Sequence, residues 1–262
     1  MRSVIARAAI APLCREPSLR SEQVSQLVLG ETATIEERRG DWRRVTCDHD
    51  GYGGWAHVGY LTEVEGDVAA GWRESARGWS LGAVLAVNGS RVRVPLRARL
   101  ALDGDGVRLP DGRRATLVEG AIPPADELAA SARETTARHW GLQYLAGTAY
   151  QWGGVTAWGV DCSGFVQTAF AARGVAVPRD ASLQAGIGSP APPAALCPGD
   201  LLFFRGDETP GITHVAFAAE SDTLIHSTVA CGGVLQEPWL PGTRAGVLRE
   251  RLVAVRRLDE GG

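Results

Sequence analysis

Hydrophobic and polar residues alternate over short stretches in the first half of the chain, and turn residues separate these stretches. An alternation with a period of two residues is typical of β-strands that bury one face. The turns recur at roughly 8–12 residue intervals, as they do in small all-β barrels. Strands are expected at 32–37, 42–47 and 53–58, and a second, more degenerate set at 81–87, 91–94, 97–102, 107–110 and 113–119. The pattern predicts two barrels, at 1–65 and 66–122.

The pattern changes at the two prolines of 123–124, after which Asp126 can cap a helix that runs to about His139. Apolar residues recur with helical spacing over 163–173, just before a glycine suited to a helix C-terminus. Short apolar runs then predict β-strands at 201–204, 212–217 and 224–227. We therefore expect an α+β domain over 123–262.

Cys162 lies where a turn meets the expected helix at 163–173. A thiol has an ordinary pKa near ~8.5, and a helix N-terminus favours an anion by about 0.3–1 kcal/mol. The remaining activation must come from a histidine. His214 and His226 fall on two successive expected strands, where they can lie side by side. One histidine could act as the general base while the other holds its second ring nitrogen.

These residues also have two other interpretations. A cysteine before a buried helix can be a small hydrophobic residue without chemistry. A cysteine and two histidines can also bind a metal, but the zinc spacings C-x-x-C and H-x(3–5)-H are absent. The sequence therefore predicts neither a metal nor a cofactor.

Six motifs in chain order resemble those of the NlpC-type cell-wall cysteine peptidases, which have a compact papain-like fold. They stand at Gly147–Gly154, Asp161–Gln167, Val177–Asp180, Pro198–Leu201, Thr213–Ala216 and Ile225–Ser227. The resemblance implies that Cys162 is the nucleophile, His214 the general base and His226 the residue that orients the base. It also implies that the Tyr150 hydroxyl could serve the oxyanion, although Tyr150 could equally be a core aromatic.

The N-terminal half also resembles known modules. Gly30 to Leu61 looks like a bacterial SH3-like domain. The order of two barrels and a peptidase domain is similar to that of cytoplasmic cysteine dipeptidyl-peptidases that recycle wall peptides. In those relatives the first barrel blocks one end of the active site, so that only a peptide with a free N-terminal L-Ala fits.

This second resemblance implies a binding site for the amine of L-Ala. The residues implied to surround this terminal residue are Tyr52, Glu22, Asp180, Asp161 and Ser163. An ammonium stripped of water needs anionic or hydrogen-bonding partners, which these side chains offer. Each also has an ordinary interpretation: Tyr52 can pack on its own barrel, Glu22 can be a surface acid, and Asp180 can cap a short helix.

The expected reaction is hydrolysis of the bond between γ-D-Glu and an L-diamino acid in a murein peptide, with release of L-Ala-γ-D-Glu. A Cys162 thiolate paired with a His214 imidazolium would attack the carbonyl, and water would hydrolyse the thioester. The backbone amide of Cys162 could serve the oxyanion. The alternatives are a general peptidoglycan endopeptidase acting on intact wall, a thiol acyltransferase or amidase, and a non-catalytic wall-binding protein.

Length, composition and cysteine content predict the number of domains, the partners and the location of the protein. The chain has 262 residues, 45% of them hydrophobic, and a net charge of −3, which suits two or three domains and gives no basic surface for nucleic acid. The N-terminal apolar residues are interrupted by Arg7 and Pro12, so we expect no secretory signal. The sequence contains no run of about 18 apolar residues, so no membrane-spanning helix is expected. Five cysteines at scattered spacings indicate free thiols, and free thiols are typical of a cytoplasmic protein. We also expect the protein to be a monomer.

Overall fold

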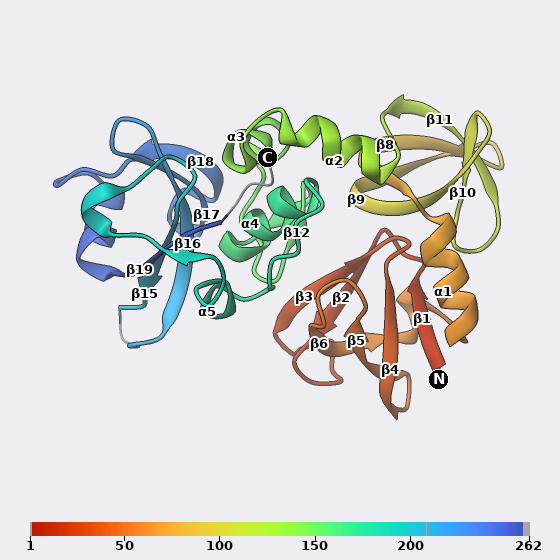
Figure 1. Ribbon diagram of the computed structural model, residues 1–262. Helices are drawn as coiled ribbons and strands as arrows, with labels where there is room; N and C mark the ends of the chain where they lie inside the picture. Colours follow the sequence, from red (N-terminus) through yellow and green to blue (C-terminus); the bar gives the residue numbers. More distant parts are fainter. Residues whose placement is uncertain (1, 208, 259–262) are drawn as a thin grey trace. The chain divides into compact units, whose positions relative to one another are not determined.

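The structure is a computed structural model that describes residues 2–207 and 209–258 (Figure 1). The chain divides into two compact units, Met1–Leu128 and Ala129–Gly262. None of the helices in the described residues has both the length and the apolar character needed to cross a membrane.

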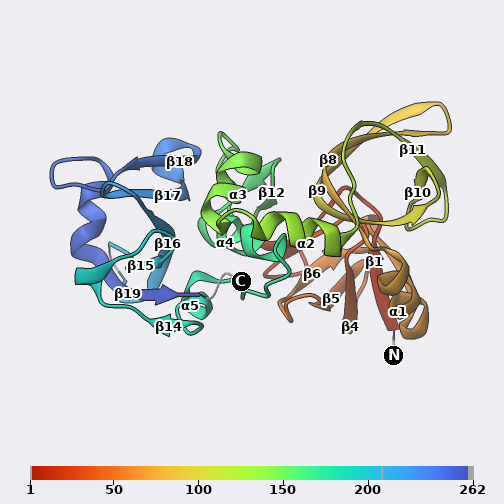
Figure 2. The same cartoon turned by 45° about the horizontal axis from the view of Figure 1, so that its top comes forward.

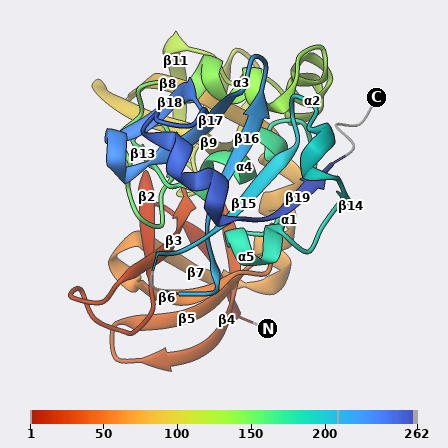
Figure 3. The ribbon, with the colours of Figure 1, turned by 90° about the vertical axis from the view of Figure 1, so that its left-hand side faces the viewer.

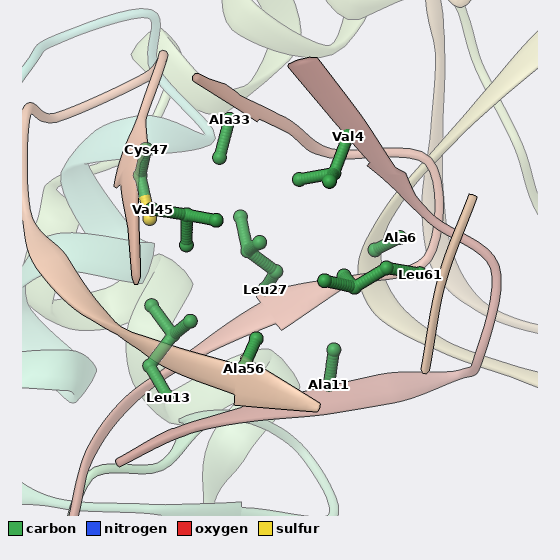
Figure 4. Packing of buried hydrophobic residues seen from close by; sticks show 10 residues of the cluster. All are labelled: Val4, Ala6, Ala11, Leu13, Leu27, Ala33, Val45, Cys47, Ala56 and Leu61. Carbon is green, nitrogen blue, oxygen red and sulfur yellow. The ribbon is translucent and has the colours of Figure 1, made fainter. Parts of the chain in front are cut away.

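The first unit begins with a seven-stranded antiparallel sheet in the order β3-β2-β6-β5-β4-β1-β7. Alternate residues of each strand point inward, as Val45 and Cys47 do in β5, and they build a small aliphatic core with Leu13 and Leu27 (Figure 4). The elements are β1 (Arg2–Ala6), β2 (Ile10–Cys14), β3 (Gln23–Val28), β4 (Thr32–Arg39), β5 (Trp42–Cys47), β6 (Gly53–His57), η1 (Val58–Tyr60) and β7 (Leu61–Glu65).

Residues 66–75, which the sequence assigned to the second barrel, form helix α1 (Gly66–Ser75). Asp67 in its first turn and Arg73 in its last turn complement the helix dipole. The Trp72 indole donates a hydrogen bond of 2.7 Å to the Gly30 carbonyl, which ties the helix to the first sheet. A short amphipathic helix is thus inserted between the two β-structures.

A closed barrel follows in the order β10-β11-β8-β9 (Figure 2). Its strands are β8 (Gly78–Val87), β9 (Ser90–Asp103), β10 (Gly106–Arg108) and β11 (Arg114–Gly120). The two strands expected at 91–94 and 97–102 are one continuous strand, β9. The strand continues through Arg97, whose φ of 81° lies in the left-handed region.

Arg97 also joins the two β-structures of the first unit. Its guanidinium Nε lies 2.7 Å from Glu31 Oε1, and both side chains are buried. Beside this pair the Arg99 amide donates to the Leu29 carbonyl at 2.8 Å. A Cβ on Gly30 would lie 1.9 Å from the Arg99 carbonyl oxygen, so the two backbones meet too closely for any side chain there.

The second unit contains a six-stranded sheet in the order β14-β19-β15-β16-β17-β18 and a two-stranded sheet of β12 and β13. Its strands are β12 (Val155–Thr156), β13 (Gly159–Val160), β14 (Ser189–Pro190), β15 (Leu201–Arg205), β16 (Ile212–Ala219), β17 (Thr223–Thr228), β18 (Gly233–Pro238) and β19 (Leu252–Arg257). The strands expected from the three apolar runs are β15, β16 and β17.

The helices of this region are α2 (Ala125–Arg133), which spans the division between the units, α3 (Ala137–Leu145), α4 (Cys162–Ala171), α5 (Ala181–Gln184), η2 (Pro193–Ala195), η3 (Val229–Cys231) and η4 (Ala245–Arg251). The single helix expected from Asp126 to about His139 is wrong. It is interrupted at 134–136, where the Thr136 side chain accepts from the His139 amide and caps a new helix.

Helix α4 packs against β16 of the larger sheet (Figure 3). Phe165 and Phe170 of the helix contact Phe217 of the strand, with ring centroids 5.8 and 5.9 Å apart. Because these aromatic contacts fix the helix on the sheet, its first residue, Cys162, is held beside β16.

The start of α4 leaves no room for a side chain at Gly164, and this gives a stability test. A Cβ there would lie 2.1 Å from the Gly154 carbonyl oxygen, whereas a Cβ on Gly71 of α1 meets nothing within 4 Å. Gly164→Ala should lower the free energy of unfolding by about 1–3 kcal/mol through overpacking. Gly71→Ala, the matched control, should raise it by about 0.5–1 kcal/mol. Urea unfolding followed by circular dichroism measures both, and a Gly164→Ala protein as stable as the wild type would contradict the close contact.

Candidate active site

Asp161 fixes the first turn of α4. Its Oδ1 accepts from the Gly164 amide at 2.7 Å, and its Oδ2 accepts from the Gly153 amide at 2.8 Å. The buried guanidinium of Arg179 donates to both oxygens, at 3.0 and 2.5 Å. Arg179 lies in the Val177–Asp180 motif, but no local pattern predicted that it would pair with Asp161. The carboxylate thus caps the helix and neutralises a buried cation.

Ser163 belongs to the same buried network. Its hydroxyl accepts from Arg179 Nη1 at 2.9 Å and donates to Asp161 Oδ1 at 3.3 Å. Asp180, the third expected binding residue of this domain, occupies the N-cap position of α5, where its side chain makes no capping hydrogen bond. The structure therefore gives Asp161 and Ser163 structural partners, and the expected contacts of all three with substrate stay predictions.

The Cys162 thiol faces strand β16. Its side chain is the first of α4, the residue is 5% exposed, and Sγ lies 4.0 Å from the Thr213 carbonyl oxygen. Burial raises the pKa of this thiol to about 12, and the nearby Asp161 carboxylate adds to the shift. Backbone amides of Val215 and Ser163 act in the opposite direction by donating toward the sulfur.

His214 of β16 and His226 of β17 are brought together as the sequence predicted. His214 Nε2 lies 2.8 Å from His226 Nδ1, and the two rings meet edge to face. Because Nε2 of His214 is engaged, Nδ1 is the ring nitrogen available to a thiol. Burial lowers the pKa of each imidazole to about 3, with smaller contributions from His226 for His214 and from the Arg244 cation for both.

These pKa shifts bear on the resting state of the site. A raised thiol pKa and lowered imidazole pKa values both favour the uncharged forms. Burial thus works against the thiolate–imidazolium pair expected from the sequence, and that pair stays a prediction. A neutral imidazole has the lone pair that a general base needs to take a proton from a thiol.

Tyr150 precedes the nucleophile in a segment that is tied to the loop after β17. Its amide donates to the Gly232 carbonyl at 2.8 Å. The pKa of its hydroxyl is raised mainly by burial, and further by Cys162 and Asp161. The phenol therefore remains a protonated donor within electrostatic range of the thiol, as a role toward an oxyanion requires.

Besides Arg179, two more charged residues at this site were not predicted from the sequence. His226 Nε2 lies 2.7 Å from Glu237 Oε1, and Arg244 forms an ion pair with the same carboxylate oxygen. Glu237 is diagonal to His226 across the β17–β18 pair, since the registered neighbour of Glu237 is Leu224. No strand was predicted at 233–238, so no signal could have placed this acid beside the histidine.

The other expected binding residues, Tyr52 and Glu22, lie in the first unit. The Tyr52 amide donates to Asp50 Oδ1 at 2.9 Å in the turn between β5 and β6. Glu22 forms an ion pair with Arg15 at 2.6 Å, and its side chain is 37% exposed. Their contact with a substrate amine stays a prediction.

One group of residues in the first unit has the donor types of a metal site. The ligand atoms of Cys47, His49 and Asp50 lie within 4.8 Å of one another. The Arg97 guanidinium lies 2.7 Å from His49 Nε2, and its positive charge opposes a cation there. These residues therefore fit an ion-pair network better than a metal.

A thiol at a helix N-terminus, packed on an antiparallel sheet that presents two paired histidines, defines a papain-like fold with a Cys-His-His site. Residues 147–252 match the NlpC/P60 family, and residues 13–61 match the bacterial dipeptidyl-peptidase SH3 domain. The chain thus contains an NlpC/P60 domain preceded by a bacterial SH3 domain, which confirms the resemblance seen in the motifs.

Named relatives support the same family. The γ-D-glutamyl-L-lysine dipeptidyl-peptidase of Bacillus cereus is 28% identical over 231 residues, which cover 78% of this chain and 66% of that protein. The protein of the same name from Bacillus subtilis is 41% identical over 85 residues, 32% of this chain and 29% of its own length. The probable endopeptidase NlpC of Escherichia coli is 38% identical over 92 residues, 35% of this chain and 60% of that protein. This chain therefore matches less than two thirds of the length of each.

Solved structures show the same fold. An NlpC/P60 family protein from Bacillus cereus superposes with a TM-score of 0.74 at 24% identity, covering 97% of this chain and 99% of that one. An NlpC/P60 endopeptidase from Photobacterium damselae gives a TM-score of 0.67 at 13% identity, covering 97% and 70%. The fold class expected from the sequence is thus confirmed.

The lowered histidine pKa values predict how stability depends on pH. Below pH 6.5 the unfolded chain binds protons on these imidazoles, while the folded chain does so only near pH 3, so acid favours unfolding. Each histidine should contribute a slope of up to about 1.4 kcal/mol per pH unit in this window. His226→Gln should therefore make the fall in unfolding free energy between pH 6.5 and pH 4 shallower. Urea unfolding of both proteins across this range is the measurement, and parallel curves would contradict the buried neutral imidazole.

Proposed function

We propose that this chain hydrolyses the γ-D-glutamyl–L-diamino acid bond of murein peptides that carry a free N-terminal L-Ala, and releases L-Ala-γ-D-Glu. The observation that carries the proposal is the joint placement of Cys162, His214 and His226 at the N-terminus of α4 and on β16 and β17. The family match supports a peptidase of peptidoglycan peptides, and the names of the Bacillus relatives support this particular bond.

The reaction is an acyl transfer in two halves. Cys162 Sγ attacks the γ-carbonyl carbon while His214 Nδ1 takes the thiol proton, and the carbonyl oxygen becomes an oxyanion. The Cys162 amide at the helix start and the Tyr150 hydroxyl are the donors suited to that charge. His214 then gives its proton to the leaving amine of the diamino acid. In the second half it takes a proton from the attacking water, the C–S bond of the thioester breaks, and the proton returns to Cys162 Sγ as the acid leaves.

Recognition of the free amine would distinguish this activity from general wall digestion. Tyr52, Glu22 and Asp180 are proposed to bind the ammonium of L-Ala, each through a hydrogen bond or an ion pair. Charge-assisted hydrogen bonds of this kind contribute about 1.5–3 kcal/mol each. Since Glu22 already pairs with Arg15, a bound ammonium would share that carboxylate with the guanidinium.

A substrate with a free N-terminal L-Ala has already lost its sugar, so the enzyme would act on released wall peptides and not on intact wall. We propose that this recycling step takes place in the cytoplasm on a monomeric enzyme, in line with the sequence expectation of free cysteines.

The nucleophile can be tested by its removal. Cys162→Ala should abolish hydrolysis of L-Ala-γ-D-Glu-L-diamino acid peptides while the protein stays folded, since the change removes only the sulfur. Cys197→Ala, which alters an exposed cysteine of the same unit, is the matched control and should keep full activity. Product formation is followed by mass spectrometry, with lysine and diaminopimelate peptides in parallel. Turnover by Cys162→Ala would rule out the cysteine mechanism.

The choice of substrate can be tested by acetylating the L-Ala amine. Acetylation removes the charge and adds bulk, so kcat/KM should fall by at least about 10- to 150-fold, the equivalent of one charge-assisted contact. Tyr52→Phe should lower kcat/KM for the free peptide and hardly change it for the acetylated one. Equal rates on both peptides, or efficient digestion of cross-linked wall, would instead identify a general wall endopeptidase.

A further inference from the structure

Glu237 and Arg244 continue the row of side chains that begins with the paired histidines. The carboxylate oxygen Oε1 of Glu237 lies 2.7 Å from His226 Nε2 and accepts a hydrogen bond from the Arg244 guanidinium. Glu237 is 8% exposed and His226 1%. Among the described residues, His226 from β17 and Arg244 from the segment before η4 are the charged or titratable groups in contact with this carboxylate. A buried acid at this place in the fold can influence the base without touching the substrate.

We propose that Glu237 is a positioning residue for the thiol chemistry, because its carboxylate decides which ring nitrogen of each histidine carries the proton. This inference rests on the proposed function, in which His214 is the general base. It deepens that proposal by assigning the protonation pattern on which the base depends.

The pattern follows from counting donors along the row. An ionised carboxylate has no hydrogen to donate, so His226 carries its proton on Nε2 and donates it to Glu237. Nδ1 of the neutral His226 is then an acceptor, and it lies 2.8 Å from His214 Nε2. His214 must therefore carry its own proton on Nε2. Its Nδ1 keeps a lone pair, which is what a base for the Cys162 thiol needs.

A donor in place of the carboxylate would reverse every step. His226 Nε2 would become an acceptor, and its proton would move to Nδ1, where it would oppose the Nε2 proton of His214. To avoid two donors facing each other, His214 would carry its proton on Nδ1. The nitrogen available to the thiol would then have no lone pair, and His214 could not act as a base.

Arg244 keeps the carboxylate in the required form. Burial raises the pKa of Glu237, and the guanidinium acts against that shift by favouring the anion. The same cation lowers the pKa of both imidazoles. Glu237 and Arg244 together thus place an ion pair with no net charge beside the histidines. His226 therefore faces a hydrogen-bond acceptor without a net negative charge being buried at the site.

The carboxylate contributes through two properties, which substitutions can separate. Gln at position 237 keeps an acceptor oxygen where Oε1 lies but loses the negative charge that stabilises the His214 imidazolium formed during attack. Leu removes both the charge and the acceptor, and it leaves His226 Nε2 without a partner. A comparison of the two variants therefore separates the effect of the negative charge from the effect of the acceptor on proton position.

The first measurement reads the proton positions directly. The full chain is labelled with 15N-histidine, and the two-bond couplings between ring nitrogens and ring hydrogens report the tautomer of each of its five histidines. His214→Gln and His226→Gln supply the assignments. We expect both residues to be protonated on Nε2 in the wild type and in Glu237→Gln. In Glu237→Leu we expect protonation on Nδ1 to appear.

The second measurement separates binding from catalysis on L-Ala-γ-D-Glu-L-diamino acid peptides. Glu237→Gln should lower kcat by about 10-fold and Glu237→Leu by about 100-fold, within the range of charge-assisted hydrogen bonds, with KM nearly unchanged. Glu250→Gln is the matched control, because it removes the same charge from an exposed acid of η4 in the same unit. It should leave kcat and KM as they are.

Protonation of wild-type His226 on Nδ1 would overturn the inference, and so would a Glu237→Leu enzyme with kcat within about threefold of the wild type. A loss confined to KM would overturn it as well. If Glu237→Leu does not fold, the wild-type tautomers and the kcat of Glu237→Gln decide the question. A wild-type enzyme that cleaves none of these peptides would contradict the proposed function alone, since the tautomers are measured without substrate.

Discussion

The buried ion pair between Asp161 and Arg179 is the contact on which the geometry of the site depends. One carboxylate caps α4, holds the Gly153 turn and binds a guanidinium that would otherwise be a buried unpaired cation. Removal of one partner from such a pair costs about 3–5 kcal/mol, because a charge is left without compensation. The direction of the first turn of α4, and with it the position of the Cys162 sulfur, is set by this pair.

Burial then determines the chemistry. The sulfur and both imidazoles are taken out of water, and burial favours the uncharged form of each. The backbone amides at the helix start and the Tyr150 hydroxyl are donors of the kind that can stabilise a developing negative charge. The charged side chains next to the thiol and the histidines form two ion pairs, Asp161 with Arg179 and Glu237 with Arg244, and each pair has no net charge.

The sequence predicted what local patterns encode. Cys162, His214 and His226 could be found because a helix start and two alternating strands surround them, and the family motifs gave them their order. Arg179 and Glu237 could not be assigned, because their partners are fixed by packing across elements and by strand register. The same limit explains the helix expected through residues 134–136. A cap acts through a single backbone position, which leaves little trace in a hydrophobic pattern.

The buried ion pair between Glu31 and Arg97 means that the first sheet and the barrel can be transferred to another protein only together. The family match covers residues 13–61, so a sequence comparison places a module boundary at the start of β7. A cut there would remove the cation that pairs with Glu31 and the Arg99 backbone that rests on Leu29 and Gly30. Recombination at that boundary would join a barrel to a foreign neighbour with a buried acid left unmatched. The portion that can be transplanted intact therefore extends to the end of the first unit, well beyond the segment that family resemblance marks.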